Sequence, residues 1–140
     1  MLRLCHINIT SIKKYKDELL ARFSNQDIIS VNETNLEKDT PFYLKGYNIY
    51  RNDRVGQTGG GVLLAVKENI KSRELINKTI DNNEIVAIEI ETKSYGRILI
   101  ASIYVPPKAK IAPAVFRDLH QINNDCIVMG RPECSVRRDG

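Results

Sequence analysis

At 140 residues the chain is long enough for one domain at most, and a domain of this size can bury about two thirds of the surface that its unfolded chain exposes. Apolar residues make up 42% of the sequence and charged residues 27%, a composition that argues against general disorder. The net charge of +4 permits a polyanionic partner but does not require one.

The N-terminal part of the sequence predicts a strand, a helix and a second strand. Residues 2–9 alternate and are rich in Leu and Ile, and residues 27–31 form a second apolar run. Between them, Ser11 can cap a helix. The apolar stripe of this helix is Ile12, Tyr15, Leu19 and Phe23. The order indicates a crossover unit, but spacing alone leaves open whether the two strands pair in parallel.

The remainder predicts mostly β-structure. Strands are expected at residues 47–51, 61–67, 84–91, 97–105 and 126–129, with turns at 53–61 and 93–96. Pro113 suits the first turn of a second helix, whose apolar stripe is Val115, Leu119 and Ile122. In 84–91, the face formed by Val86, Ile88 and Ile90 is strongly apolar. Strands covered by helices predict an α+β layered sandwich.

Cysteine usage and hydropathy favour an intracellular protein. The three cysteines are too scattered for a disulfide framework, and none lies in a Cys-x-x-Cys pair. The N-terminus lacks the apolar run of a secretory signal, and no stretch approaches the ~20 apolar residues that span a bilayer. We therefore expect a location in the nucleus or cytoplasm, with no secretion and no membrane partner.

Two predicted strand ends carry residues suited to phosphate chemistry. Glu33 follows a buried strand, where a carboxylate is well placed to bind Mg²⁺ together with water and phosphate. Asn8 ends the first strand and is a neutral donor that suits a phosphate. Each residue alone has an equally simple interpretation, as a solvated acid or as a turn residue.

Other candidates are individually weak. The run Gly59–Gly61 lets the backbone approach a ligand, but such a run most often only makes a turn, and it lacks the Lys-Ser or Lys-Thr of a P-loop. Tyr104 on an apolar strand is most simply a packed side chain. His6 and His120 have no acidic or cysteine neighbours at ligand spacing, which favours structural roles.

The order of these signals is more specific than any one of them. The blocks at residues 2–8, 27–36, 46–54, 59–62 and 104–107 resemble, in this order, the endonuclease domain of non-LTR retrotransposon reverse transcriptase polyproteins. That domain belongs to the endonuclease/exonuclease/phosphatase superfamily. The resemblance covers residues 2–130, and the Tyr-Arg-x-Asp-Arg block before the three glycines is its most specific part.

The resemblance implies a four-layered α/β sandwich, here C-terminally truncated, with an active site at one edge of two facing sheets. It implies Mg²⁺-dependent phosphodiester hydrolysis that nicks target DNA, no small-molecule cofactor, and a reverse transcriptase domain that follows in the polyprotein. By resemblance Glu33 binds Mg²⁺, Asn8 lies near metal and phosphate, and Tyr104 contacts the scissile phosphate. Thr10 stands where the family usually has Asn or Asp.

The pattern breaks after Gly130. The family continues with Gly-Asp-Phe-Asn or Gly-Asp-Leu-Asn, whose Asp orients the attacking water, but here Arg131 and Glu133 occupy the Asp and Asn positions. An arginine roughly 6 Å from Mg²⁺ is repelled by about 5 kcal/mol at an effective dielectric near 20. The later Ser-Asp-His of the family is also missing. We therefore expect weak or absent metal binding and no activity.

The tail has a simple explanation. Codons for Gly-Arg-Pro-Glu-Cys can, after loss of one nucleotide, encode Gly-Asp-Leu-Asn-Ala. We therefore divide the chain into a partial domain at 1–130 and a divergent tail at 131–140, which we interpret as translated out of frame. Three interpretations stay open: an inactive endonuclease, a module that binds DNA weakly and non-specifically without cleaving it, and a non-functional fragment. Related phosphatases of the superfamily are a further alternative.

Overall fold

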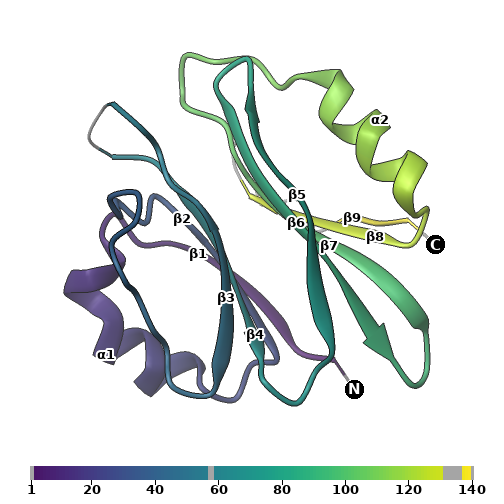
Figure 1. The fold of residues 1–140 in the computed structure, drawn as a ribbon, viewed down its shortest axis with the longest axis horizontal. Coiled ribbons are helices and arrows are strands. Elements are labelled where there is room, and N and C mark those ends of the chain that lie inside the picture. The colour runs from purple at the N-terminus through teal and green to yellow at the C-terminus, as the bar shows by residue number, and fades with distance from the viewer. Residues whose placement is uncertain (1, 57–58, 131–136, 140) are drawn as a thin grey trace.

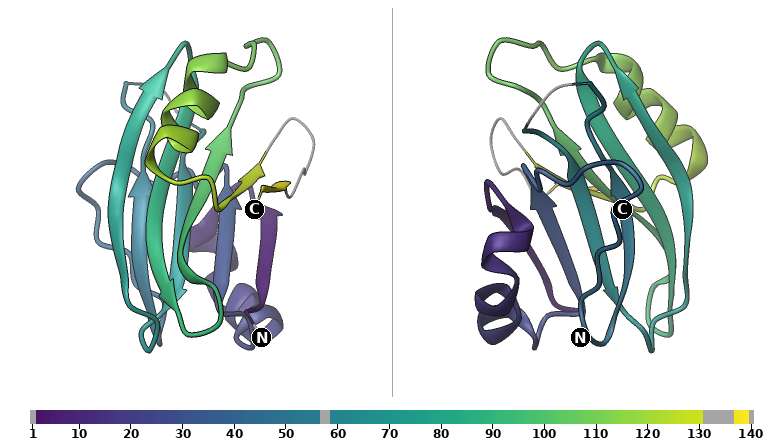
Figure 2. Two further views of the ribbon diagram at one scale, coloured as in Figure 1. Left: turned by 90° about the vertical axis from the view of Figure 1, so that its right-hand side faces the viewer. Right: turned by 60° about the vertical axis from the view of Figure 1, so that its left-hand side comes forward.

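The computed structural model describes residues 2–56, 59–130 and 137–139. Two β-sheets face each other, and one helix covers the outer face of each, which gives four layers in the order helix, sheet, sheet, helix (Figure 1). In the right-hand view of Figure 2 the two helices again lie on opposite sides of the molecule. The four-layered α+β sandwich expected from the sequence is confirmed.

The first sheet has the strand order β1-β2-β4-β3. Its strands are β1 (Leu4–Asn8), β2 (Ile28–Asn32), β3 (Tyr47–Asn52) and β4 (Val62–Lys67). The helix α1 (Ile12–Phe23) joins β1 to β2, which pair in parallel, so the question that spacing left open is answered in favour of a crossover. The strand β4 runs antiparallel to both of its neighbours.

The second sheet has the order β5-β6-β7-β8-β9. Its strands are β5 (Ser72–Ile80), β6 (Asn83–Thr92), β7 (Gly96–Tyr104), β8 (Cys126–Gly130) and β9 (Arg137–Asp139). The helix α2 (Pro113–Ile122) connects β7 to β8, which also pair in parallel, while the other neighbours are antiparallel. Neither helix in the described residues is long and apolar enough to cross a membrane.

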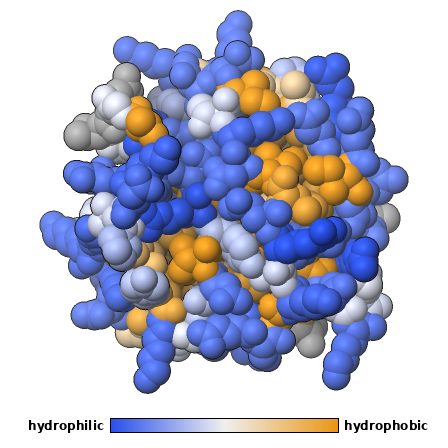
Figure 3. All heavy atoms as spheres, in the orientation of Figure 1, coloured by the Kyte–Doolittle hydropathy of each residue, from blue (hydrophilic) through white to orange (hydrophobic). Residues whose placement is uncertain are grey.

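Apolar side chains fill the three spaces between the four layers. The sequence indicates one strongly apolar face for β6, but both faces of this strand are buried. Val86, Ile88 and Ile90 pack between the sheets, while Ile85 and Ala87 pack beneath α2. Both faces are buried because each has its own covering layer. On the face shown in Figure 3 polar side chains predominate, with apolar patches between them.

Local details differ from the sequence predictions. The strand β5 was not predicted, because it is an edge strand with mostly exposed, polar side chains and only Ile76 buried. Tyr15 was placed in the apolar stripe of α1, but its backbone is non-helical (φ −110°, ψ 18°) and its side chain is exposed. Ile122 likewise is exposed at the end of α2. Ser11 occupies the N-cap position of α1 without a side-chain capping bond.

Candidate nucleic-acid site at the strand ends

The ends of strands from both sheets meet at one end of the sandwich. In the first sheet Asn8 pairs with Asn32, and Val62 lies between Asn32 and Asn52, so four strand termini are level. The side chain of Asn32 donates to the backbone oxygen of Ile103 in β7 at 3.0 Å. This edge therefore brings together polar residues from segments far apart in the sequence.

The two residues first proposed for metal and phosphate are in contact. The side-chain amide of Asn8 donates a hydrogen bond to the carboxylate of Glu33. Glu33 follows β2 directly and has a left-handed backbone with φ of 58°, a conformation that is unfavourable for a residue with a side chain. Strained residues cluster at functional sites, and the backbone of Glu33 is such a case. The hydrogen bond between Asn8 and Glu33 joins the end of β1 to the loop after β2.

The glycine turn supports this loop through its backbone. The Glu33 N–H donates to the oxygen of Gly61, and the Asn35 N–H donates to the oxygen of Gly60, both at 2.9 Å. Gly61 has φ of 95°, and a Cβ there would lie 2.4 Å from Thr34 Oγ1. Only glycine fits this position without a shift. The turn thus braces the loop that carries Glu33.

The other sequence-predicted residues lie as follows. Tyr104 ends β7 and is buried in the core between the sheets. Thr10 lies in the turn between β1 and α1, with an exposed side chain and φ of 64°. Arg131 and Glu133 lie outside the described residues.

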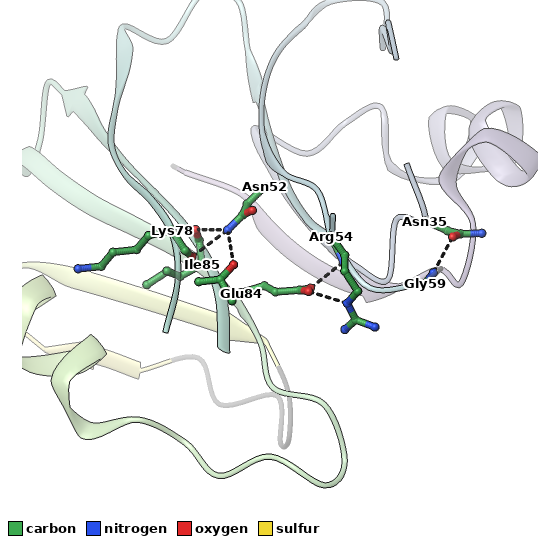
Figure 4. Close-up of polar contacts among 9 residues, drawn as sticks. Asn35, Asn52, Arg54, Gly59, Lys78, Glu84 and Ile85 are labelled. Carbon is green, nitrogen blue, oxygen red and sulfur yellow. Dashed lines mark hydrogen bonds and ion pairs between the residues drawn. The ribbon is translucent and has the colours of Figure 1, made fainter. Parts of the chain in front are cut away.

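Sequence reasoning missed an ion pair beside Tyr104. Arg54 Nε donates to Glu84 Oε2 at 2.8 Å, and Glu84 Oε1 accepts the Gly61 N–H at 2.7 Å (Figure 4). Glu84 pairs with Tyr104 in the β6–β7 register. Arg54 belongs to the family block, but nothing local marked Glu84, which is simply an acid at the start of an apolar strand. Tertiary structure alone shows that the two meet.

A second missed feature is a buried polar network below the edge. Asn32 Oδ1 accepts from the Ser102 hydroxyl at 3.3 Å, Ser102 shares a hydrogen bond with Ser30 at 2.7 Å, and Ser30 shares one with His6 Nδ1 at 2.8 Å. Burial lowers the pKa of His6, which keeps its imidazole neutral near pH 7. These contacts favour a structural role for His6, as a member of the buried network.

The Arg51–Arg54 block forms a second ion pair at the same end. Arg51 Nε lies 2.9 Å from Asp53 Oδ2, and the Asp53 side chain is buried. Burial raises the pKa of Asp53, while Arg51 acts in the opposite direction. Both arginines of the block thus have a carboxylate partner.

Comparison with solved structures shows which known fold has this arrangement. The chain is similar to an AP endonuclease from Archaeoglobus fulgidus, with a TM-score of 0.64, 18% identity, and coverage of 93% of this chain and 56% of that one. It is also similar to a 3′ phosphatase, NExo, from Neisseria bound to a product DNA hairpin, with a TM-score of 0.63, 13% identity, and coverage of 93% and 57%. The chain has the endonuclease/exonuclease/phosphatase fold. It spans little more than half of the length of these structures.

A further structural relative and one sequence relative agree with this fold. D. rerio TDP2 complexed with a single-strand DNA product matches with a TM-score of 0.56 and 13% identity over 92% of this chain and 58% of that one. In sequence, the chain is 23% identical over 107 residues to the RNA-directed DNA polymerase from the mobile element jockey of Drosophila funebris. That match covers 76% of this chain and 12% of the polymerase. No family model matches the sequence. The resemblance to a retrotransposon endonuclease domain is confirmed.

The endonuclease/exonuclease/phosphatase fold implies a divalent metal, and two residues at the edge offer ligand types that suit a hard cation. Glu33 offers a carboxylate and Asn8 an amide oxygen, the ligand types that Mg²⁺ takes alongside water and phosphate. Across the described residues no group of three or more His, Cys, Asp or Glu could hold a metal ion. Glu33 and Asn8 are therefore the donors at this edge whose ligand types fit Mg²⁺.

Proposed function

We propose that this chain is part of a Mg²⁺-dependent DNA endonuclease domain of a mobile element, and that alone it binds DNA weakly without cleaving it. The observation that carries the proposal is the contact between Asn8 and Glu33 at the shared strand-end edge. Its setting on a nuclease-type fold and the similarity to a mobile-element polymerase support it.

The described residues would serve the metal and phosphate side of the reaction. Glu33 and Asn8 would hold Mg²⁺, which when bound polarises a phosphoryl oxygen as a Lewis acid. The Asn8 amide can alternatively donate to a phosphate oxygen. By resemblance Tyr104, which ends β7 with its side chain buried between the sheets, would contact the scissile phosphate.

The proposed lack of cleavage follows from residues after Gly130. A water molecule attacking phosphorus needs a group that orients it and accepts its proton. By resemblance that group is an aspartate, where this sequence has Arg131. A guanidinium cannot accept a proton at neutral pH, and its charge would oppose the metal. Glu133 likewise replaces the asparagine that would hold the phosphate.

Lysines at the same end of the sandwich support a polyanionic partner. Lys13 and Lys14 open α1 directly after the β1–α1 turn, and Lys108 and Lys110 lie in the loop after β7. All four side chains are exposed. Contacts from such lysines to phosphates give sequence-independent, salt-sensitive binding.

A nicking assay with a binding assay tests both parts of the proposal. Supercoiled plasmid incubated with the chain and Mg²⁺ or Mn²⁺ should stay intact, as it does with Glu33→Ala. Binding of a DNA duplex, followed by fluorescence anisotropy, should weaken steeply with salt. Metal-dependent nicking above the Glu33→Ala background would overturn the proposed inactivity, and absence of binding at low salt would overturn the DNA partner.

A further inference from the structure

Arg54 lies at the strand-end edge with most of its donors unused. Its Nε donates to Glu84, and its Cζ lies 5.7 Å from the centre of the Tyr104 ring. Within the part of the chain that the structure describes, Nη1 and Nη2 have no hydrogen-bond partner. Figure 4 shows both nitrogens pointing away from Glu84. The side chain is 22% exposed, so solvent reaches it.

Glu84 holds this guanidinium in a fixed orientation. Its side chain is only 5% exposed, and its two oxygens accept from Arg54 Nε and the Gly61 N–H. A buried carboxylate is costly unless it is paired and hydrogen-bonded. Here both requirements are met by groups at the candidate site. The carboxylate therefore anchors Arg54 to the same turn that braces Glu33.

The backbone of Gly60 confines the guanidinium from another side. A Cβ at Gly60 would lie 2.3 Å from Arg54 Cζ and 2.4 Å from its Nε. The guanidinium thus occupies the space that any larger residue would fill. Because Gly60 O also accepts the Asn35 N–H, the arginine and the loop after Glu33 share one support. The geometry leaves Arg54 little freedom to lose on binding a ligand.

We propose that Arg54 binds a backbone phosphate of the nucleic acid, beside the position served by Asn8 and Glu33. Arginine has five N–H donors in a planar fork, and Nε uses only one of them. The remaining donors match two oxygens of a phosphate, and Glu84 preorients them. This inference rests on the proposed function, since it requires nucleic acid at this edge.

A lysine at the same position separates phosphate binding from structural support. In Arg54→Lys the single ammonium can still pair with Glu84, but it cannot also present a fork to a phosphate. We expect the melting temperature to stay close to that of the wild type. Affinity for a short DNA duplex should fall about tenfold at low salt, because a charge-assisted contact is lost. The slope of log K against log salt should fall by about 0.9.

Arg73→Lys is the matched control. Arg73 Nε pairs with Glu89 at 3.1 Å, in an ion pair of the same kind five residues further along β6. That distance is about 17 Å along a strand, so the control leaves the edge intact. The control should bind DNA like the wild type. A second variant, Arg54→Gln, should show the same loss of slope as Arg54→Lys.

A measurement on the wild-type chain covers the case in which the variants do not fold. In nitrogen-15 NMR spectra, the Nε–Hε signal of Arg54 should shift when duplex is added, whereas that of Arg73 should not. Folded Arg54 variants that bind with wild-type affinity and slope, or an unmoved Arg54 signal during binding, would overturn this inference and leave the proposed function standing. A wild-type chain that does not bind DNA would overturn both.

Discussion

Asn32 donates its side-chain amide to the backbone oxygen of Ile103 at 3.0 Å, and this bond ties the end of β2 in one sheet to β7 in the other. Asn32 is fully buried, and its own oxygen accepts from Ser102. The link keeps the two sheet ends together at the level of Asn8 and Tyr104. The position of the candidate site therefore depends on a polar residue inside the core.

Asn32→Ala should destabilise the chain by about 2–3 kcal/mol, because it removes two hydrogen bonds from a buried network, the one to the Ile103 oxygen and the one from the Ser102 hydroxyl. Chemical denaturation measures the change. Asn123→Ala is the control, since Asn123 also donates to a backbone oxygen, that of Arg97, but at an exposed position. A loss in Asn32→Ala no larger than in Asn123→Ala would show that the network contributes little.

Replacing Glu33 should reveal the strain in its backbone. At φ of 58° the Cβ atom of alanine makes the left-handed backbone conformation unfavourable, whereas glycine has no Cβ atom. Glu33→Gly should therefore be more stable than Glu33→Ala by about 1 kcal/mol. Both variants remove the carboxylate, so the comparison isolates the backbone. Thermal unfolding of the pair decides it. Equal stabilities would mean that the loop relaxes out of the left-handed region.

Gly61→Ala and Gly96→Ala separate a backbone cost from a steric one. Gly96 has φ of 70° and open space around its Cβ position, so alanine there should cost about 1 kcal/mol. Gly61 has φ of 95° and Thr34 Oγ1 at 2.4 Å from that position, so the cost should be larger by about 1–3 kcal/mol. Urea unfolding of both variants provides the comparison. A Gly61 variant as stable as the Gly96 variant would contradict the close approach.

Acid should destabilise the chain through His6. Its pKa is lowered by burial from the ordinary 6.5, so the unfolded state binds a proton more readily than the folded state. The stability contributed by neutral His6 is full above pH 6.5 and is lost as the pH falls through the lowered pKa of the folded state. His6→Gln should flatten this part of the stability profile. A profile that is identical in the variant would assign the acid sensitivity to other groups.

The gene should explain residues 131–140. Restoring the frame at the Gly130 codon should give Asp, then Leu or Phe, then Asn, with a Ser-Asp-His segment and a reverse transcriptase further downstream. The reason is that the departure from the family pattern runs through the whole tail, whereas a point substitution would spare its neighbours. Sequencing the locus tests it. If no other frame or nearby exon encodes the motif, the tail is native to the protein.

The sequence alone predicted the order of most elements and singled out two candidate residues, Asn8 and Glu33, which the structure brings into contact. Apolar periodicity located α1, α2 and the strands with buried faces, because burial of a side chain leaves a local pattern in the chain. Asn8 and Glu33 were visible for the same reason, since each follows an apolar run that has an evident end. The Arg51–Arg54 block was found by resemblance, but not with the partners that it binds.

Tertiary structure decided the rest. The edge strand β5 has no apolar alternation, because its side chains mostly face water and it is held by backbone pairing with β6. Arg54 and Glu84 are 30 residues apart, and Asn32 and Ile103 are 71 apart, so neither pairing leaves a local signal. A polar residue at a strand end looks the same in the sequence whether its side chain faces solvent or a buried partner. The way in which the two sheets pack against each other decides between these two environments.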